Sequence, residues 1–107
     1  MKHRHEKREE YMKELAGIFI AKESNRQSLI TVTRFSLSDH EDKALILISV
    51  LPETQEAAVI DFLTRNVSDF RKFVMSKIPT GKIPYFTFEI DKGEKIARKI
   101  DALSSSQ

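Results

Sequence analysis

Side chains that commonly perform nucleophilic catalysis or bind metals are few in this sequence, and their spacing suits neither task. The chain has no cysteine, and its histidines stand at positions 3, 5 and 40. His3 and His5 are two residues apart, so a helix would point them in different directions. No Gly-x-Ser-x-Gly elbow is present either. We therefore expect solvated surface histidines, no nucleophile and no metal site.

Phosphate-binding loops and paired catalytic carboxylates are also missing. The glycines, at positions 17, 81 and 93, are too scattered for a Walker loop or a dinucleotide fingerprint. Pairs such as Glu9 and Glu10 lie in densely charged stretches, where nothing indicates the burial that shifts a carboxyl pKa toward acid–base catalysis. The sequence predicts a non-enzymatic protein with no cofactor and no small-molecule substrate.

The segment that best suits a ligand is RNVSDFRK, residues 65–72, which interrupts a helical pattern. An interrupted helix exposes backbone N–H groups at the start of its second half, and these groups attract phosphate together with the positive end of the helix dipole. Arg71 and Lys72 lie in the next turn, and Lys77 and Lys82 would extend the cationic path. The alternative is an ordinary capped kink with solvated basic side chains, and these residues alone do not separate the two.

The charge distribution favours phosphate as a partner. The formal net charge is only +2. However, residues 39–61 hold six acidic side chains against one lysine, whereas residues 65–82 hold five basic side chains against Asp69. Residues 92–99 add four basic side chains against Glu94. Such separation gives one face a local positive potential, although basic residues on ordinary solvated helices are also common.

The elements that must position these residues begin with an amphipathic helix over about residues 5–22, with acidic residues near the positive end of its dipole. Leu29–Leu37 is rich in β-branched residues and predicts a strand. Ala44–Leu51 is apolar on both alternating faces, which predicts a strand buried on both sides or nearly so. Because only a short polar link separates the two runs, we expect a hairpin.

Apolar residues at helical spacing then continue to Ile78, with good cap formers in mid-pattern at residues 66–69 that predict a kink or a break. A third strand is expected over Pro84–Ile90, followed by a basic helix over Lys92–Leu103. The apolar side chains of this last helix, expected to point inward, are Ile96, Ile100 and Leu103. The order is helix, strand, strand, broken helix, strand, helix, which predicts an α+β arrangement with helices on one face of a three-stranded sheet.

The length of 107 residues allows one compact domain, which we expect to span residues 1–107 with an ordered core of about 5–103 and short tails. No apolar run approaches the roughly 20 residues that cross a membrane. The absence of cysteine fits a reducing cytoplasm.

Several stretches together resemble one family over most of the chain, from His5 to Leu103. They are REEYMKELAGIFIAKE, SLITVTRFSLSDHEDKALILISVLP, NVSDFRKFVMSKI, IPYFTFEID and KIDAL. The most specific are LITVTRFSLS with the following strand that ends in SVL, and Pro84 followed by an aromatic-rich strand and Asp91. On these residues the chain resembles the ribosome-binding factor A family of bacterial small-subunit assembly factors.

The resemblance implies a KH-like fold of the second type without the usual Gly-x-x-Gly loop. In the family, an Ala-x-Gly kink replaces that loop, and a basic residue follows three positions after the Gly. Arg71 matches this basic residue, which places the kink at Asn66-Val67-Ser68. Both signature residues are absent from this chain, and the carboxylate of Asp69 directly after the kink would repel phosphate.

The resemblance also implies a function. Family members bind the immature small (30S) ribosomal subunit near its neck, assist maturation of its rRNA and of the rRNA 5′ end, matter especially in the cold, and perform no chemistry. We therefore expect a monomeric, cytoplasmic RNA-binding protein of ribosome biogenesis, whose partners are the small ribosomal subunit and its rRNA. The residues expected to contact RNA are Arg65, Ser68, Arg71, Lys72, Lys77, Lys82, Lys95, Arg98 and Lys99. The alternative is a protein-interaction module that docks a protein partner through the acidic stretch 39–61 or an exposed sheet face.

Overall fold

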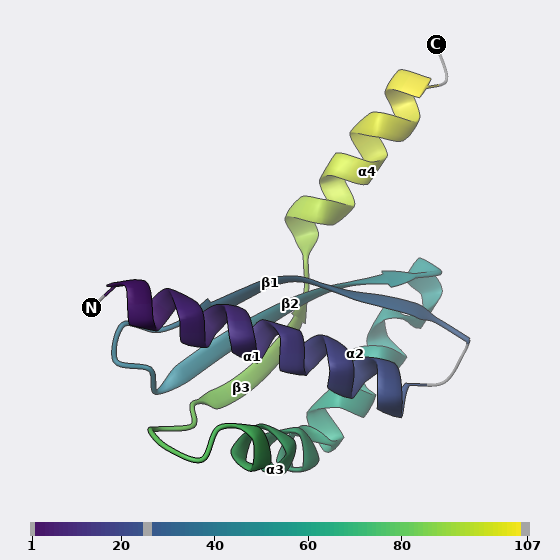
Figure 1. Cartoon of the computed structure of the whole chain (residues 1–107). Coiled ribbons are helices and arrows are strands. Elements are labelled where there is room, and N and C mark those ends of the chain that lie inside the picture. Colours follow the sequence, from purple (N-terminus) through teal and green to yellow (C-terminus); the bar gives the residue numbers. More distant parts are fainter. Residues whose placement is uncertain (1, 25–26, 106–107) are drawn as a thin grey trace.

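The structure is a computed structural model that describes residues 2–24 and 27–105, and among these the side chains of all but residues 2, 3, 98 and 101–105. In that part of the chain, the elements follow the predicted order of helix, strand, strand, broken helix, strand and helix (Figure 1). They are α1 (Lys2–Glu23), β1 (Leu29–Leu37), β2 (Lys43–Leu51), a short 3-10 helix (Glu53–Gln55), α2 (Glu56–Arg65), α3 (Val67–Lys77), β3 (Tyr85–Ile90) and α4 (Lys92–Ser105).

The sheet has the order β1-β2-β3, so β2 lies in the centre. β1 and β2 form the predicted antiparallel hairpin. In its turn, the Ser38 hydroxyl oxygen accepts hydrogen bonds from the backbone N–H groups of Asp42 (3.2 Å) and Lys43 (3.0 Å). β3 runs parallel to β2, because the chain crosses over through α2 and α3 before it returns to the sheet.

One face of the sheet carries the hydrophobic core. The buried residues of β2 are Ala44, Ile46, Ile48 and Val50, and they alternate along the strand. They pack with buried side chains of α1, α2 and α3, which therefore share this face. On the opposite face, Leu45 and Leu47 are only half-buried. The prediction that β2 is buried on both sides or nearly so therefore holds fully for the first face and only in part for the second.

Phenylalanine rings connect α1, α3 and β3 inside the core. Phe70 of α3 is fully buried, and its ring centroid lies 5.2 Å from that of Phe19 on α1, 4.6 Å from Phe86 and 5.7 Å from Phe88. Tilted and edge-to-face pairs at these distances are favourable beyond the area that they bury. The prediction that Phe70 belongs to the core is confirmed. Phe73 is half-buried at the edge of the same cluster, with its ring centroid 5.9 Å from that of Phe19.

The predicted break in the helical pattern is present, and it lies at Asn66 between α2 and α3. The side-chain amide of Asn66 donates a hydrogen bond to the Phe62 carbonyl at 2.8 Å, and the Asn66 backbone N–H bonds to the same carbonyl at 3.1 Å. Asn66 therefore caps the end of α2. It makes no side-chain cap for α3, so the expected capping by this residue acts on the preceding helix.

α4 differs from the expected arrangement, because it extends away from the sheet instead of covering it (Figure 1). Ile96 is 59% exposed and Ile100 is 57% exposed, so the expectation that they point inward was wrong. The side chain of Leu103 lies outside the described residues. Apolar residues at helical spacing indicate a helix and its apolar side, but they do not show whether another element lies against that side.

The first turn of α4 is anchored to the sheet through Asp91. Its Oδ1 accepts a hydrogen bond from the backbone N–H of Glu94 at 2.9 Å, and its Oδ2 accepts one from the Thr33 hydroxyl at 2.5 Å. Thr33 lies where the register of β1 shifts between Val32 and Arg34, which removes it from the regular ladder. The hydrogen bond from Thr33, followed by that from Glu94, holds the pKa of Asp91 below its ordinary value.

Replacing Asp91 with asparagine tests this anchor. In the wild type, the lowered pKa contributes stability that is fully present above the ordinary value of 3.8 and is lost as the pH falls through the lower folded value. Asparagine caps helices about as well as aspartate but does not titrate. Asp91→Asn should therefore lose less of its free energy of unfolding between about pH 5 and pH 2 than the wild type. Urea unfolding at a series of pH values measures this difference, and parallel curves for the two proteins would contradict the anchor.

Candidate nucleic-acid interface

Three of the lysines predicted to contact RNA are exposed on α3 and on the 78–84 loop that follows it. They are Lys72, Lys77 and Lys82. Within the described residues none of them forms an ion pair with a carboxylate. The Lys77 Nζ lies 5.8 Å from the centroid of the Phe73 ring, and the Lys82 Nζ lies 3.4 Å from the His40 carbonyl. All three ammonium groups are available to a phosphate.

Arg65 and Ser68 flank the break between α2 and α3. The Arg65 guanidinium lies 3.2 Å from the carboxylate of Asp61, and both side chains are 68% exposed, so solvent screens this pair and leaves it weak. Ser68 is exposed in the first turn of α3, next to Asp69. The Asp69 carboxylate already complements the positive end of the α3 dipole. The break therefore attracts phosphate less strongly than was predicted from the interruption of the helical pattern.

Arg71 has structural partners. Its Nη1 donates a hydrogen bond to the Pro84 carbonyl at 2.6 Å, and its Nη2 donates one to the Ile83 carbonyl at 3.0 Å. The guanidinium carbon also lies 5.4 Å from the centroid of the Tyr85 ring. The side chain thus joins α3 to the start of β3, with part of its fork of donors already used. Arg71 brings positive charge to this region, but its first role is to hold the loop.

The remaining predicted contacts lie on α4, which Figure 1 shows on the other side of the sheet from α3. The Lys95 Nζ lies 3.1 Å from Glu56 and 3.7 Å from Glu53. The hydrogen bond and the charge of Glu56 raise the pKa of Lys95. This ion pair joins α4 to the start of α2. Lys99 is exposed, and the side chain of Arg98 lies outside the described residues. The structure does not bring these residues together with the cations of α3.

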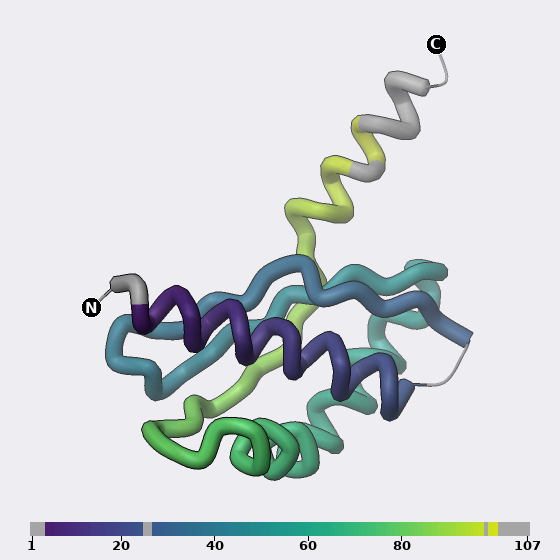
Figure 2. Tube along the Cα trace, in the orientation of Figure 1, coloured from purple at the N-terminus to yellow at the C-terminus, as the bar shows by residue number. Residues whose placement is uncertain are grey.

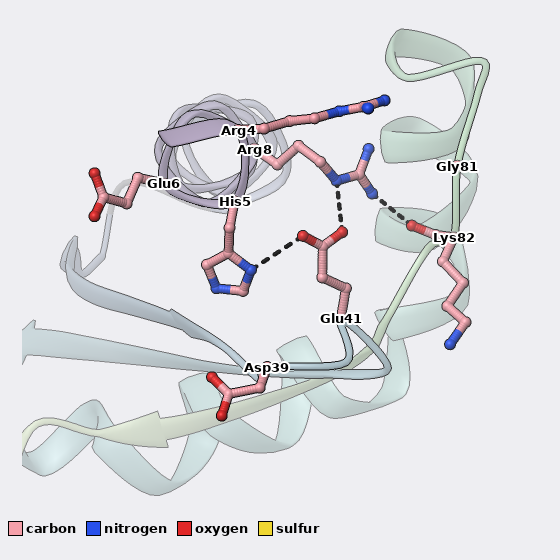
Figure 3. A pocket seen from close by; sticks show the side chains of 8 residues that line it. All are labelled: Arg4, His5, Glu6, Arg8, Asp39, Glu41, Gly81 and Lys82. Carbon is pink, nitrogen blue, oxygen red and sulfur yellow. Dashed lines mark hydrogen bonds and ion pairs between the residues drawn. The ribbon is translucent and has the colours of Figure 1, made fainter. Parts of the chain in front are cut away.

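The start of α1, the hairpin turn and the loop after α3 meet at one end of the molecule (Figure 2). A hollow of about 480 Å³ lies between them (Figure 3). There Glu41 pairs with the His5 Nδ1 at 3.0 Å and with the Arg8 Nε at 2.9 Å. The Arg8 Nη2 also donates a hydrogen bond to the Lys82 carbonyl at 2.6 Å. His5 is consequently half-buried and bonded, so the expectation of a solvated histidine was wrong at this position.

Charges balance in this hollow, because three carboxylates and three Lys or Arg side chains line it. Gly81 directly precedes Lys82 in the loop, and its φ of 89° suits glycine. A Cβ at this position would also lie 3.1 Å from the Arg8 Nη1. The hollow is therefore a structural junction that fixes α1 against the hairpin and the loop, and it is a poor site for an anion.

Two cations of α1, Arg4 and Lys7, belong to the candidate interface and were missed from the sequence. Both are exposed, and neither pairs with a carboxylate among the described residues. Figure 3 shows Arg4 extending past Arg8 toward the loop that carries Gly81. Both line a groove together with Lys77 at the end of α3. Lys82 lines the neighbouring hollow with Arg4. Lys72 precedes Lys77 by five residues on α3, which places it about 140° away around the helix axis. We name the exposed cations Arg4, Lys7, Lys72, Lys77 and Lys82 the α1–α3 flank.

Other kinds of site find no support in the part of the chain that the structure describes. No group of three or more His, Asp or Glu side chains there could hold a metal ion. None of the helices described is both long enough and apolar enough to cross a membrane.

The order of the elements, the parallel return of β3 and the interrupted α2–α3 pair define the fold as α+β and KH-like. The sequence model of ribosome-binding factor A matches residues 3–104, which is nearly the whole chain. The chain therefore belongs to the ribosome-binding factor A family. A comparison with curated proteins found no match.

Solved structures of similar proteins have the same fold. The crystal structure of ribosome-binding factor A from Thermus thermophilus gives a TM-score of 0.68 at 17% identity, over 77% of this chain and 89% of that one. The solution NMR structure of a Thermotoga maritima protein, proposed to be a ribosome-binding factor A, gives a TM-score of 0.65 at 20% identity. The match covers 76% of this chain and 80% of that one. A homology model of Thermus thermophilus ribosome-binding factor A, fitted into a cryo-electron microscopy map of its complex with 30S, gives a TM-score of 0.69 at 16% identity, over 79% of this chain and 92% of that one.

Proposed function

We propose that this chain binds the immature small (30S) ribosomal subunit and assists the processing of its rRNA and the maturation of the subunit, without catalysing a reaction. It acts as a monomer in the cytoplasm, with its greatest importance in the cold. The observation that carries the proposal is the α1–α3 flank, where exposed cations from two helices and a loop lack carboxylate partners among the described residues. Membership of the ribosome-binding factor A family supports the ribosome as the partner.

A surface of this kind suits folded RNA for a physical reason. Helical RNA is recognised mainly through its shape, its phosphates and its 2′-hydroxyl groups, because its deep groove does not admit side chains. Each Lys or Arg that meets a phosphate releases condensed counterions, so binding weakens steeply as salt rises. The side chains proposed to make the main contacts are those of the α1–α3 flank. Arg65 and Ser68, beside the break between α2 and α3, and Arg98 and Lys99 of α4 are proposed as secondary contacts.

The alternative function, docking of a protein partner, would use the face of the sheet that α1, α2 and α3 leave open. Leu45 and Leu47 are half-buried there, and Thr87 and Glu89 are exposed beside them. Among the described residues of the three strands, this face carries two exposed cations, Arg34 and Lys43, beside Glu89, and so fewer cations than the flank. Binding to it would respond weakly to salt, which separates the two functions.

Co-sedimentation with free small ribosomal subunits tests the proposal. The wild type should pellet with the subunits at low salt and dissociate as salt rises. Replacing Lys72 and Lys82 with glutamine should lower the slope of log affinity against log salt by about 1.4 to 1.8 while leaving folding intact. The matched control is Lys22→Gln with Lys43→Gln, which removes the same charge from exposed positions outside the flank. Failure of the wild type to bind subunits, or binding that salt does not affect, would refute the proposal.

A further inference from the structure

A groove of about 360 Å³ runs between α1 and the end of α3 on the α1–α3 flank. It is lined by the cations Arg4, Lys7, Arg8 and Lys77, by Tyr11, and by the segment Ile78–Pro79. We call it the α1–α3 groove. Unlike the neighbouring hollow, where charges balance, it has no carboxylate among the described residues that line it.

Three of the four cations in this groove are free to bind a ligand. Arg8 is already bonded to Glu41 and to the Lys82 carbonyl. By contrast, Arg4, Lys7 and Lys77 are exposed and form no ion pair within the described residues. Arg4 also borders the neighbouring hollow with its three carboxylates, whereas Lys7 and Lys77 line only the groove, which has no carboxylate among its described lining residues. The groove therefore attracts an anionic chain.

Tyr11 gives the groove a second property, an accessible aromatic ring. The side chain is 41% exposed, on a helix where Ile18 is also exposed and most other apolar residues are buried in the core. It follows Lys7 by one helical turn, so the ring and the ammonium group lie on the same face of α1. Among the described residues, no hydrogen bond or ring contact engages it. A ring placed among cations is the usual platform on which an unpaired base stacks.

We infer that the α1–α3 groove binds an unpaired stretch of RNA, with backbone phosphates on Arg4, Lys7 and Lys77 and one base stacked on Tyr11. This inference rests on the proposed function and specifies which part of an rRNA the groove takes. A duplex keeps its bases stacked inside, so it would use the cations and leave the ring without a partner. An acidic polypeptide would likewise bind the cations and leave the Tyr11 ring without a partner. The combination of charge and ring therefore favours a single strand.

Fluorescence anisotropy with a fluorescein-labelled ten-residue oligouridylate tests the inference on the full chain. Removing two cations with Arg4→Gln and Lys7→Gln should weaken binding roughly tenfold and lower the salt slope by about 1.4. Tyr11→Ala should weaken it roughly tenfold with an unchanged salt slope, whereas Tyr11→Phe should bind like the wild type. The control pair Lys22→Gln and Lys43→Gln should have a smaller effect than the first pair. Thermal unfolding of each variant excludes loss of folding as the cause.

Intrinsic fluorescence reports the stacked ring directly. The chain has no tryptophan and only two tyrosines, Tyr11 and Tyr85. In a Tyr85→Phe background, which keeps a ring beside Arg71, Tyr11 is therefore the one tyrosine. The oligouridylate should quench its emission, and a blunt-ended RNA duplex of equal charge should quench it much less.

Specific results would overturn the inference. Equal oligouridylate affinity for Tyr11→Ala and the wild type would remove the stacked base, as would unquenched Tyr11 emission on binding. Equal affinity for oligouridylate and for polyglutamate of the same charge would show that charge alone selects the occupant. If the wild type and the groove variants pellet with small subunits to the same extent, the groove inference fails while the proposed function stands. If the wild type does not pellet with subunits, the proposed function itself fails.

Discussion

Replacing Phe70 with alanine should lower the free energy of unfolding by about 3–5 kcal/mol. Its side chain is fully buried, and its ring meets those of Phe19, Phe86 and Phe88. The loss includes the transfer of the ring from water and the cavity that remains between α1, α3 and β3. Because domains of this size are stable by about 5–15 kcal/mol, the variant should be only marginally folded. Urea unfolding followed by circular dichroism measures the change.

Phe73→Ala is the matched control for this prediction. Phe73 lies on the same helix and packs against Phe19, but it is only half-buried. Its removal should cost clearly less than that of Phe70, since less apolar area is returned to water and the site is open to solvent. Equal losses for the two variants, or a loss below about 1 kcal/mol for Phe70→Ala, would show that the aromatic cluster does not hold the helices on the sheet.

Replacing Arg71 with alanine should lower the free energy of unfolding by about 1.5–3 kcal/mol, because hydrogen bonds to a charged group contribute in this range. The variant leaves the Pro84 and Ile83 carbonyls without the guanidinium that now bonds to them. Pro84 is fully buried, so its carbonyl would lack a partner in a region with little access for water. Arg71→Lys should recover part of the loss at most, since an ammonium group cannot reproduce the forked geometry.

The same variant shows whether Arg71 also binds RNA. The sequence predicted that Arg71 and Lys72 both contact RNA, whereas the structure gives hydrogen-bond partners to Arg71 and leaves Lys72 exposed. Lys72→Ala should leave the unfolding curve unchanged and weaken binding to small subunits. An Arg71→Ala protein with wild-type stability and a strongly reduced salt slope would assign Arg71 to the phosphate contacts instead.

Much of this fold could be predicted from the sequence, because its strands have distinct local signals. The β-branched run Leu29–Leu37 forms β1 with the predicted bounds, and the aromatic run Pro84–Ile90 forms β3 from Tyr85 onward. The interruption near Asn66 was also clear, since its amide competes for backbone hydrogen bonds. The sequence did not show which helix Asn66 would cap, because its side chain can bond to the helix before it or to the helix after it.

The arrangement of α4 could not be predicted in the same way. Ile96 and Ile100 have the spacing of a buried stripe, yet both are exposed. The direction of α4 depends on contacts between residues distant in sequence, namely Asp91 with Thr33 and Lys95 with Glu56. Periodicity carries no information on such pairs.

The candidate site was recovered in part for a similar reason. Lys72, Lys77 and Lys82 were identified from the cationic run that ends the broken helix, and they are exposed as expected. Arg4 and Lys7 were missed, because only the packing of α1 beside α3 places the start of the chain next to Lys77. Charge patterns along a sequence identify cations, but tertiary contacts decide which of them share a surface.

The most direct test of the central claim is an electron microscopy map of this protein bound to an immature small ribosomal subunit. We expect the α1–α3 flank to face rRNA, with Lys72 and Lys77 next to backbone phosphates, and the open face of the sheet to be turned away. A map in which the flank faces solvent while the open sheet face or α4 makes the contact would contradict it.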